Sequence, residues 1–175
     1  MKPSPLLQAI ADVLRQDESL LNSLSDEDYT RKLPTVFGST VGGHYRHCLD
    51  HFKSLLLGLD AGEINYDRRE RNSWIENDRA FALLETHRIL HAFGSVPTPF
   101  LKCPINVRSK INYELDVAPL IGSTVGRELV YAVAHTIHHY ALIAVICGIL
   151  EVPLPAGFGV APSTLKYHAD QPKAA

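Results

Sequence analysis

The sequence predicts an all-α protein, an up-down-up-down four-helix bundle with a short β-hairpin inserted between the third and fourth helices. Two observations lead to this fold class: four long segments carry apolar residues at helical spacing, and one shorter segment alternates apolar with polar residues. The length of 175 residues suits one domain with one hydrophobic core. We therefore expect a single domain over residues 1–175, in which residues 156–175 form a C-terminal tail that packs on the bundle.

The first helix is expected over about residues 4–24. Ser4 is a favourable N-cap residue, and Pro5 is favoured at the first position of a helix. Residues 25–38 are polar and contain Pro34, so we expect a loop there. The apolar residues of the first helix recur at helical spacing: Leu6, Leu7, Ile10, Val13, Leu14, Leu21 and Leu24.

A second helix is expected to begin near Ser39 or Thr40 and to end at the glycines of residues 58–62. A charged connector follows at residues 63–72. The apolar residues of this helix keep to one side: Val41, Tyr45, Cys48, Phe52, Leu55 and Leu59.

A third helix is expected from Ser73 to Phe93, because Ser73 and Glu76 have the spacing of a capping box. Apolar and polar residues alternate between residues 111 and 117, which is the period of a half-buried strand. Paired with residues 101–107, this strand would form the hairpin.

The fourth helix is predicted over residues 123–150, where apolar residues occupy most sides and indicate a heavily buried helix. The pentapeptide GSTVG opens the second helix at residues 38–42 and the fourth at residues 122–126. In an up-down-up-down bundle these two helices would run parallel, with their histidines at similar depth.

The composition argues against several classes of protein. The formal net charge of -2 gives no overall attraction to nucleic acid. The longest apolar run, residues 141–150, is about half the length that a membrane-spanning helix needs. Three widely spaced cysteines without a C-x-x-C motif favour a reducing compartment, so we expect a cytoplasmic protein.

Six of the nine histidines fall in two clusters. In the second helix, His44, His47 and His51 are spaced i, i+3 and i+7, which keeps them within a sector about 60° wide. In the fourth helix, His135 and His139 are i, i+4 neighbours whose rings can reach one cation.

Imidazole nitrogen binds zinc, nickel or ferrous iron, and three such ligands leave coordination positions open for water or substrate. His138 lies about 60° to 100° away from the His135 and His139 pair and is a weaker candidate. The alternative interpretation is a set of core histidines that form hydrogen bonds to backbone groups or tyrosine hydroxyls.

The segments STVGGHYRHCLDHF and HTIHHYALI resemble the two signature segments of the DinB-like superfamily, which includes the YfiT type of metal-dependent hydrolase. The resemblance implies a four-helix bundle, a homodimer and a bound divalent metal. It also implies the ligands: His47, which stands three residues before Asp50, together with His135 and His139.

The helix-two ligand has two rivals. His44 and His51 flank His47, and either one would serve as a replacement ligand or as a second-shell base. The centre of the apolar stripe favours His51, which also has the same distance from GSTVG as His135 has. The chain departs from the family at Tyr140, Ala141 and Leu142, where family members often carry Arg-Gly-Gln.

The resemblance implies a metal-dependent hydrolase or a low-molecular-weight thiol transferase that acts on a small molecule. The competing hypothesis is a non-catalytic metal- or ligand-binding stress-response module. Arg68, Arg69 and Arg71 form either a solvated connector with local ion pairs or a guanidinium clamp for a carboxylate or another anion at the bundle mouth. Trp74 is expected as an anchor in the core or in a dimer interface.

Overall fold

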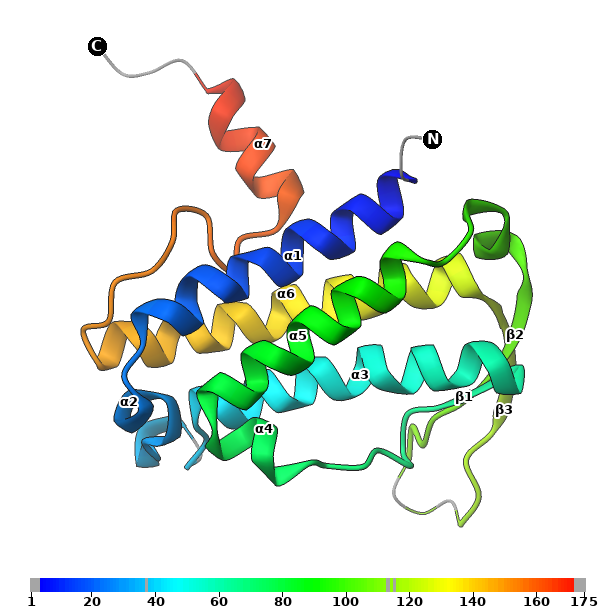
Figure 1. The fold of residues 1–175 in the computed structure, drawn as a ribbon, viewed down its shortest axis with the longest axis horizontal. Helices are drawn as coiled ribbons and strands as arrows, with labels where there is room; N and C mark the ends of the chain where they lie inside the picture. The colour runs from blue at the N-terminus through cyan, green and yellow to red at the C-terminus, as the bar shows by residue number, and fades with distance from the viewer. Residues whose placement is uncertain (1–3, 37, 113, 115, 172–175) are drawn as a thin grey trace.

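The computed structural model describes residues 4–171 except 37, 113 and 115. The chain is mostly helical, and a small sheet lies at one end of its long helices (Figure 1). The helices are α1 (Pro5–Ser23), α2 (Asp26–Thr30), α3 (Val41–Ala61), α4 (Ser73–Asn77), α5 (Arg79–Gly94), α6 (Val125–Ile149) and α7 (Pro162–Asp170), with 3-10 turns η1 (Pro34–Val36) and η2 (Thr98–Lys102). The strands are β1 (Glu63–Asn65), β2 (Pro104–Arg108) and β3 (Leu120–Thr124).

The four long helices α1, α3, α5 and α6 lie side by side, and α3 and α5 run in the same direction (Figure 1). The Tyr45 hydroxyl contacts Thr86, and seven residues further along both helices the rings of Phe52 and Phe93 meet at 5.8 Å. The predicted up-down-up-down order is therefore wrong, because the second and third long helices, α3 and α5, run parallel rather than antiparallel.

Helix α6 runs antiparallel to α3, again in contrast to the prediction. His44 near the start of α3 contacts His139, whereas His51 one to two turns later packs on Tyr131. The helices α3 and α6 therefore run in opposite directions, but their histidines still lie at the same level along the two helices.

The physical reason for the parallel order is the connection between α3 and α5. Residues 62–72 could span at most about 36 Å if fully extended, whereas the 21-residue helix α3 is about 31 Å long. The connector can therefore return along the whole of α3 before α4 and α5 begin.

The sheet has the order β1-β2-β3, with β1 parallel to β2 and β2 antiparallel to β3. An antiparallel pair is thus present, but its second strand is β3 rather than residues 111–117. Ile111 and Val117 are 79% and 72% exposed, and residues 113 and 115 lie outside the described part of the chain. β3 leads directly into α6, and the Val125 amide donates to the Cys103 carbonyl at the start of β2, so this pairing also fixes the entry to α6.

The predicted third helix is divided at Asp78. Asn72 caps α4 and Asp78 caps α5, each by accepting a backbone N–H with its side chain, at 3.0 and 2.9 Å. The expected capping box does not form, because the N-cap is Asn72 rather than Ser73, and Glu76 binds Arg46 on α3. Trp74 is 66% exposed in this monomer, so it is not an anchor of the core.

Both copies of GSTVG begin a helix through a threonine N-cap. The Thr40 hydroxyl accepts from the Gly43 amide at 2.8 Å, and Thr124 accepts from the Arg127 amide at 3.2 Å. The second glycine of each copy permits a close approach, because a Cβ at Gly42 would lie 2.1 Å from the Glu76 carbonyl oxygen.

Helix α6 is the one helix, among the residues that the structure describes, that is long and apolar enough to cross a membrane. The core helix of a globular protein meets the same criteria of length and composition. Here α6 packs against α1 and α3 and carries two histidines, His135 and His139, whose rings lie close together.

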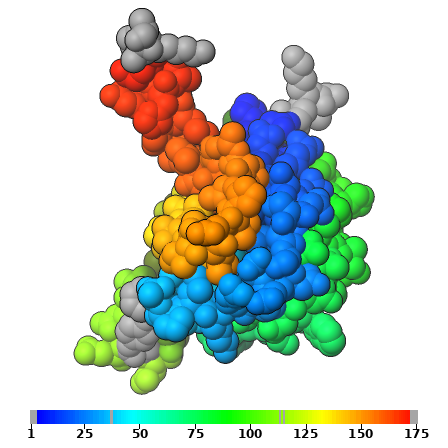
Figure 2. Space-filling model, turned by 90° about the vertical axis from the view of Figure 1, so that its left-hand side faces the viewer, coloured from blue at the N-terminus to red at the C-terminus, as the bar shows by residue number. Residues whose placement is uncertain are grey.

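The segment after α6 contacts the bundle through Phe158, whose ring stacks on Tyr140 at 4.8 Å. Helix α7 has no buried residue and projects from the body of the molecule (Figure 2).

Candidate metal centre

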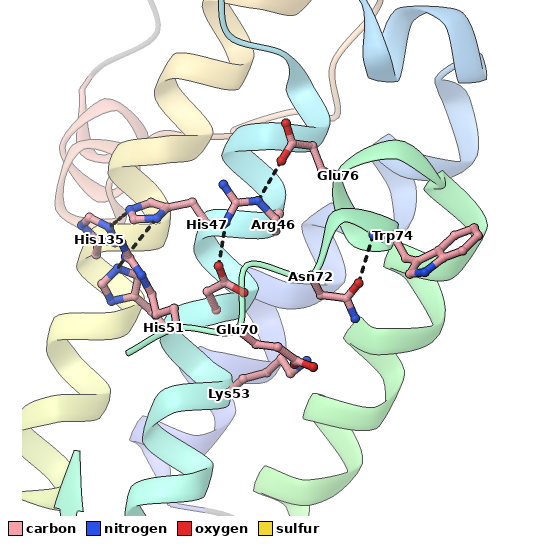
Figure 3. Close-up of polar contacts among 11 residues, drawn as sticks. Arg46, His47, His51, Lys53, Glu70, Asn72, Trp74, Glu76 and His135 are labelled. Carbon is pink, nitrogen blue, oxygen red and sulfur yellow. Dashed lines mark hydrogen bonds and ion pairs between the residues drawn. The ribbon is translucent and has the colours of Figure 1, made fainter. Parts of the chain in front are cut away.

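Histidines of α3 and α6 face each other across the contact between these helices. His44, His47 and His51 project from α3, and His135 and His139 project from α6. Figure 3 shows His47 and His51 directed toward His135. The helical spacings of the sequence therefore place five imidazoles in one cluster.

Three of these histidines lie close enough together to hold one metal ion. One ring nitrogen from each of His47, His135 and His139 lies within 4.8 Å of the other two. Nε2 of His47 is 2.9 Å from Nε2 of His135, and the His139 ring centre is 4.6 Å from both other ring centres. His138 is exposed at the edge of this group. Because all the donors are imidazole nitrogens, the set fits zinc, nickel or ferrous iron.

Hydrogen bonds fix the orientation of His139. Its Nδ1 is 2.9 Å from Nδ1 of His44, and Nε2 of His44 is 3.2 Å from the Ser39 hydroxyl oxygen. Ser39 donates its hydrogen to the Val36 carbonyl, so it accepts from His44 Nε2–H. His44 then accepts from His139 Nδ1–H, which leaves the lone pair of His139 Nε2 free. His44 therefore lies behind His139 and supports it.

His51 lies beside the three-histidine group but faces a different partner. It is 3% exposed, and its Nε2 is 3.0 Å from Nη1 of Arg69. Its ring packs between Tyr66 and His135, at 5.1 and 4.3 Å. The choice of His47 over His51 as the ligand stays a prediction.

Burial keeps the histidines neutral. Loss of solvent lowers the pKa of His47 to about 4, with further contributions from Arg69 and His135, and lowers the pKa of His139 to about 3, with contributions from His47 and His135. The pKa of His135 is also lowered, chiefly by burial. At neutral pH the ring nitrogens are therefore not blocked by a second proton.

Asp50, three residues after His47, forms an ion pair with Arg46. Its carboxylate accepts from Arg46 at 2.8 Å. Arg46 also donates to Glu76 at 2.9 Å, as Figure 3 shows. Burial raises the pKa of Asp50, and the nearby Arg46 opposes this change. The three residues tie α4 to α3 beside the site.

A pocket of about 310 Å³ opens beside the histidines. Its lining includes His44, His47, His139, Lys32, Arg46 and Glu76. A pocket of about 470 Å³ between α1 and α5 has no histidine in its lining. We place the candidate site at the smaller pocket because two of the three grouped histidines border it.

Three further residues near the histidine cluster were not predicted from the sequence: Tyr66, Glu128 and Tyr131. The Tyr66 hydroxyl donates to buried Glu128 at 2.9 Å, and the Tyr131 ring stacks on His135 at 5.6 Å. Tyr131 precedes His135 by four residues, so helical spacing contained a signal for it. Tyr66 comes from the connector, and local spacing contains no signal for its position.

Stability of the metal-free protein is expected to fall as the pH drops below about 6.5. The pKa of His51 is lowered to about 2 by burial, so between these values the unfolded state binds a proton that the folded state does not. Stability from this group is therefore complete above pH 6.5 and is lost as the pH falls. We expect His51→Gln to reduce the slope of unfolding free energy against pH by about 1.4 kcal/mol per pH unit near pH 5.5.

Urea unfolding at several pH values measures this slope. His168→Gln, on the exposed helix α7, is the matched control and should leave it unchanged. Equal slopes for His51→Gln and the unmodified protein would contradict the prediction.

These features define a mostly helical protein with a candidate three-histidine metal centre. Its fold is similar to that of a DinB-like protein from Bacillus cereus, with a TM-score of 0.55 and 14% identity, over 86% of this chain and 94% of the other. No family model matches the chain. A curated relative, FK506-binding protein 5 of Rhizopus delemar, is 38% identical over 104 residues, which are 59% of this chain and 27% of that protein.

Proposed function

We propose that this chain is a divalent-metal-binding member of the DinB-like superfamily, built on a four-helix bundle. The observation that carries the proposal is the approach of one nitrogen from each of His47, His135 and His139 to within 4.8 Å. The likeness in fold to the Bacillus cereus protein supports the family. The metal that suits three imidazoles is zinc, nickel or ferrous iron.

We further propose an enzyme, either a hydrolase or a transferase of a low-molecular-weight thiol, that acts on a small molecule. A bound divalent metal would lower the pKa of a water or thiol and polarise an electrophile. His44 holds His139 in one orientation, and the pocket of about 310 Å³ admits a small molecule from solvent. Three protein ligands leave room for that molecule, as in catalytic rather than structural metal sites.

Metal analysis followed by a thiol titration tests this function. The purified protein is expected to hold about one equivalent of metal, and its Co²⁺ form is expected to gain a thiolate-to-metal absorption band when 2-mercaptoethanol is added. Absence of bound metal would refute the proposal. A Co²⁺ form that binds no thiol and exchanges no water would favour the non-catalytic module, in which the ion only joins α3 to α6.

We also propose that two copies of the chain associate as a homodimer. Val130, Val145 and Ile149 are 55%, 55% and 49% exposed, and their positions fall on one face of α6. A monomeric mass in solution would exclude this assembly.

A further inference from the structure

Arg69 is a guanidinium without an acidic partner at the edge of the histidine cluster. Its Nη1 lies 3.1 Å from Nδ1 of His47 and 3.0 Å from Nε2 of His51. Its Nε is buried and has no hydrogen-bond partner, and within the described part of the chain no carboxylate forms an ion pair with it. The neighbouring Arg46, in contrast, has both Asp50 and Glu76.

The contact with Arg69 determines which tautomer His47 adopts. A guanidinium only donates, so Nδ1 of His47 accepts and the ring proton must lie on Nε2. That proton then points to Nε2 of His135, 2.9 Å away. In this tautomer neither nitrogen of His47 has a free lone pair. A metal ion and Arg69 therefore compete for His47.

Electrostatic repulsion also opposes the binding of a metal ion beside Arg69. A dication held by His47 and His135 would lie close to the positive guanidinium, in a partly buried place where charges are weakly screened. The repulsion is relieved if an anion joins the site. Metal binding also removes His47 as an acceptor, so that Nη1 of Arg69 keeps only His51 and its Nε still has no partner.

We propose that Arg69 is the substrate-anion-binding residue of this site: it holds His47 in the metal-free protein and, when metal binds, turns to the carboxylate of a small molecule beside the metal. This proposal rests on the proposed metal function and names the substrate class, a small carboxylate. The planar fork of a guanidinium matches a carboxylate, and the unpartnered Nε supplies the second donor. Of the two interpretations of the arginine-rich connector, the clamp thus applies to Arg69 alone.

Co²⁺ titration of metal-free protein in a buffer without carboxylates is the first test. Arg69→Gln is expected to bind Co²⁺ about tenfold more tightly than the unmodified protein, because the competing charge and donor are gone. Arg69→Lys keeps the charge and should bind like the unmodified protein. Arg68→Gln is the matched control on the same connector, where Arg68 is exposed, and should also show no change.

Equal or weaker Co²⁺ binding by Arg69→Gln would overturn the competition, and so would equally tight binding by Arg69→Lys. These outcomes would leave the metal function intact. Absence of Co²⁺ binding in every form would overturn the metal function and this proposal together.

Acetate titration of the Co²⁺ forms is the second test, with neutral acetamide as the comparison ligand. The unmodified protein is expected to change its Co²⁺ spectrum with acetate and not with acetamide. Arg69→Gln should bind acetate at least about tenfold more weakly, since the guanidinium partner is lost. Equal acetate affinity in both proteins would show that the metal alone binds the anion and would overturn the role of Arg69.

Discussion

Alanine at His47, His135 or His139 is expected to lower metal affinity by more than about a hundredfold, because each change removes one of the three proposed ligands. His44→Ala removes only the group behind His139, so a loss of about 10- to 100-fold is expected. His138→Ala, on the exposed edge, is the matched control and should keep full affinity. Co²⁺ titration against a competing chelator measures all five variants.

The three variants at His47, His135 and His139 should also lose the stabilisation that metal gives. A ligand that binds only the folded state at a hundredfold excess over its Kd adds about 2.7 kcal/mol to the free energy of unfolding. Thermal unfolding with and without zinc should therefore show a large shift for the unmodified protein and for His138→Ala, and none for His139→Ala. Retention of one equivalent of metal by both His135→Ala and His139→Ala would show that the site is wrongly assigned.

His51→Ala distinguishes the two candidate ligands on α3. Because Nε2 of His51 contacts Arg69 and not the three-histidine group, a smaller loss of metal affinity than for His47→Ala is expected. A larger loss for His51→Ala would transfer the ligand role to His51.

Helical periodicity was sufficient to predict which residues share a face. It identified His44, His47 and His51 on one helix and His135 and His139 on another, and the structure brings these faces together. The apolar stripe favoured His51 over His47, because a stripe shows only the direction of the core. The structure turns His51 toward Arg69, which lies on a connector that no local pattern relates to the cluster.

For a similar reason, the sequence did not predict the directions in which the helices run. Residues 62–72 are long enough to return along α3, and the contacts of Glu70 with Lys53 and of Arg69 with His47 on α3 show that they do so. The pairing of Ile64 with Val107 is a contact between distant parts of the chain. Residues 111–117 alternate as a strand does, but the described residues of this segment pair with no strand, and alternation alone does not produce one.

Gly42→Ala is expected to destabilise the protein by roughly 3 kcal/mol, the upper part of the range for overpacking. A Cβ at this position would lie 2.1 Å from the Glu76 carbonyl oxygen and 2.8 Å from the ring of Tyr29. Tyr29 is fully buried, and its hydroxyl donates to the Ile75 carbonyl at 2.6 Å, so neither neighbour can move without disturbing α4.

The matched control is Gly148→Ala, near the end of α6, where an added Cβ meets no atom within 4 Å. That variant should be stabilised by about 0.5–1 kcal/mol, because alanine favours a helix over glycine and fits without strain. Urea unfolding of the two variants beside the unmodified protein measures both changes. Equal stability of Gly42→Ala and Gly148→Ala would mean that α4 does not pack on the start of α3. The Arg46 to Glu76 contact beside the histidines would then lose its support, because the same packing of α4 positions Glu76.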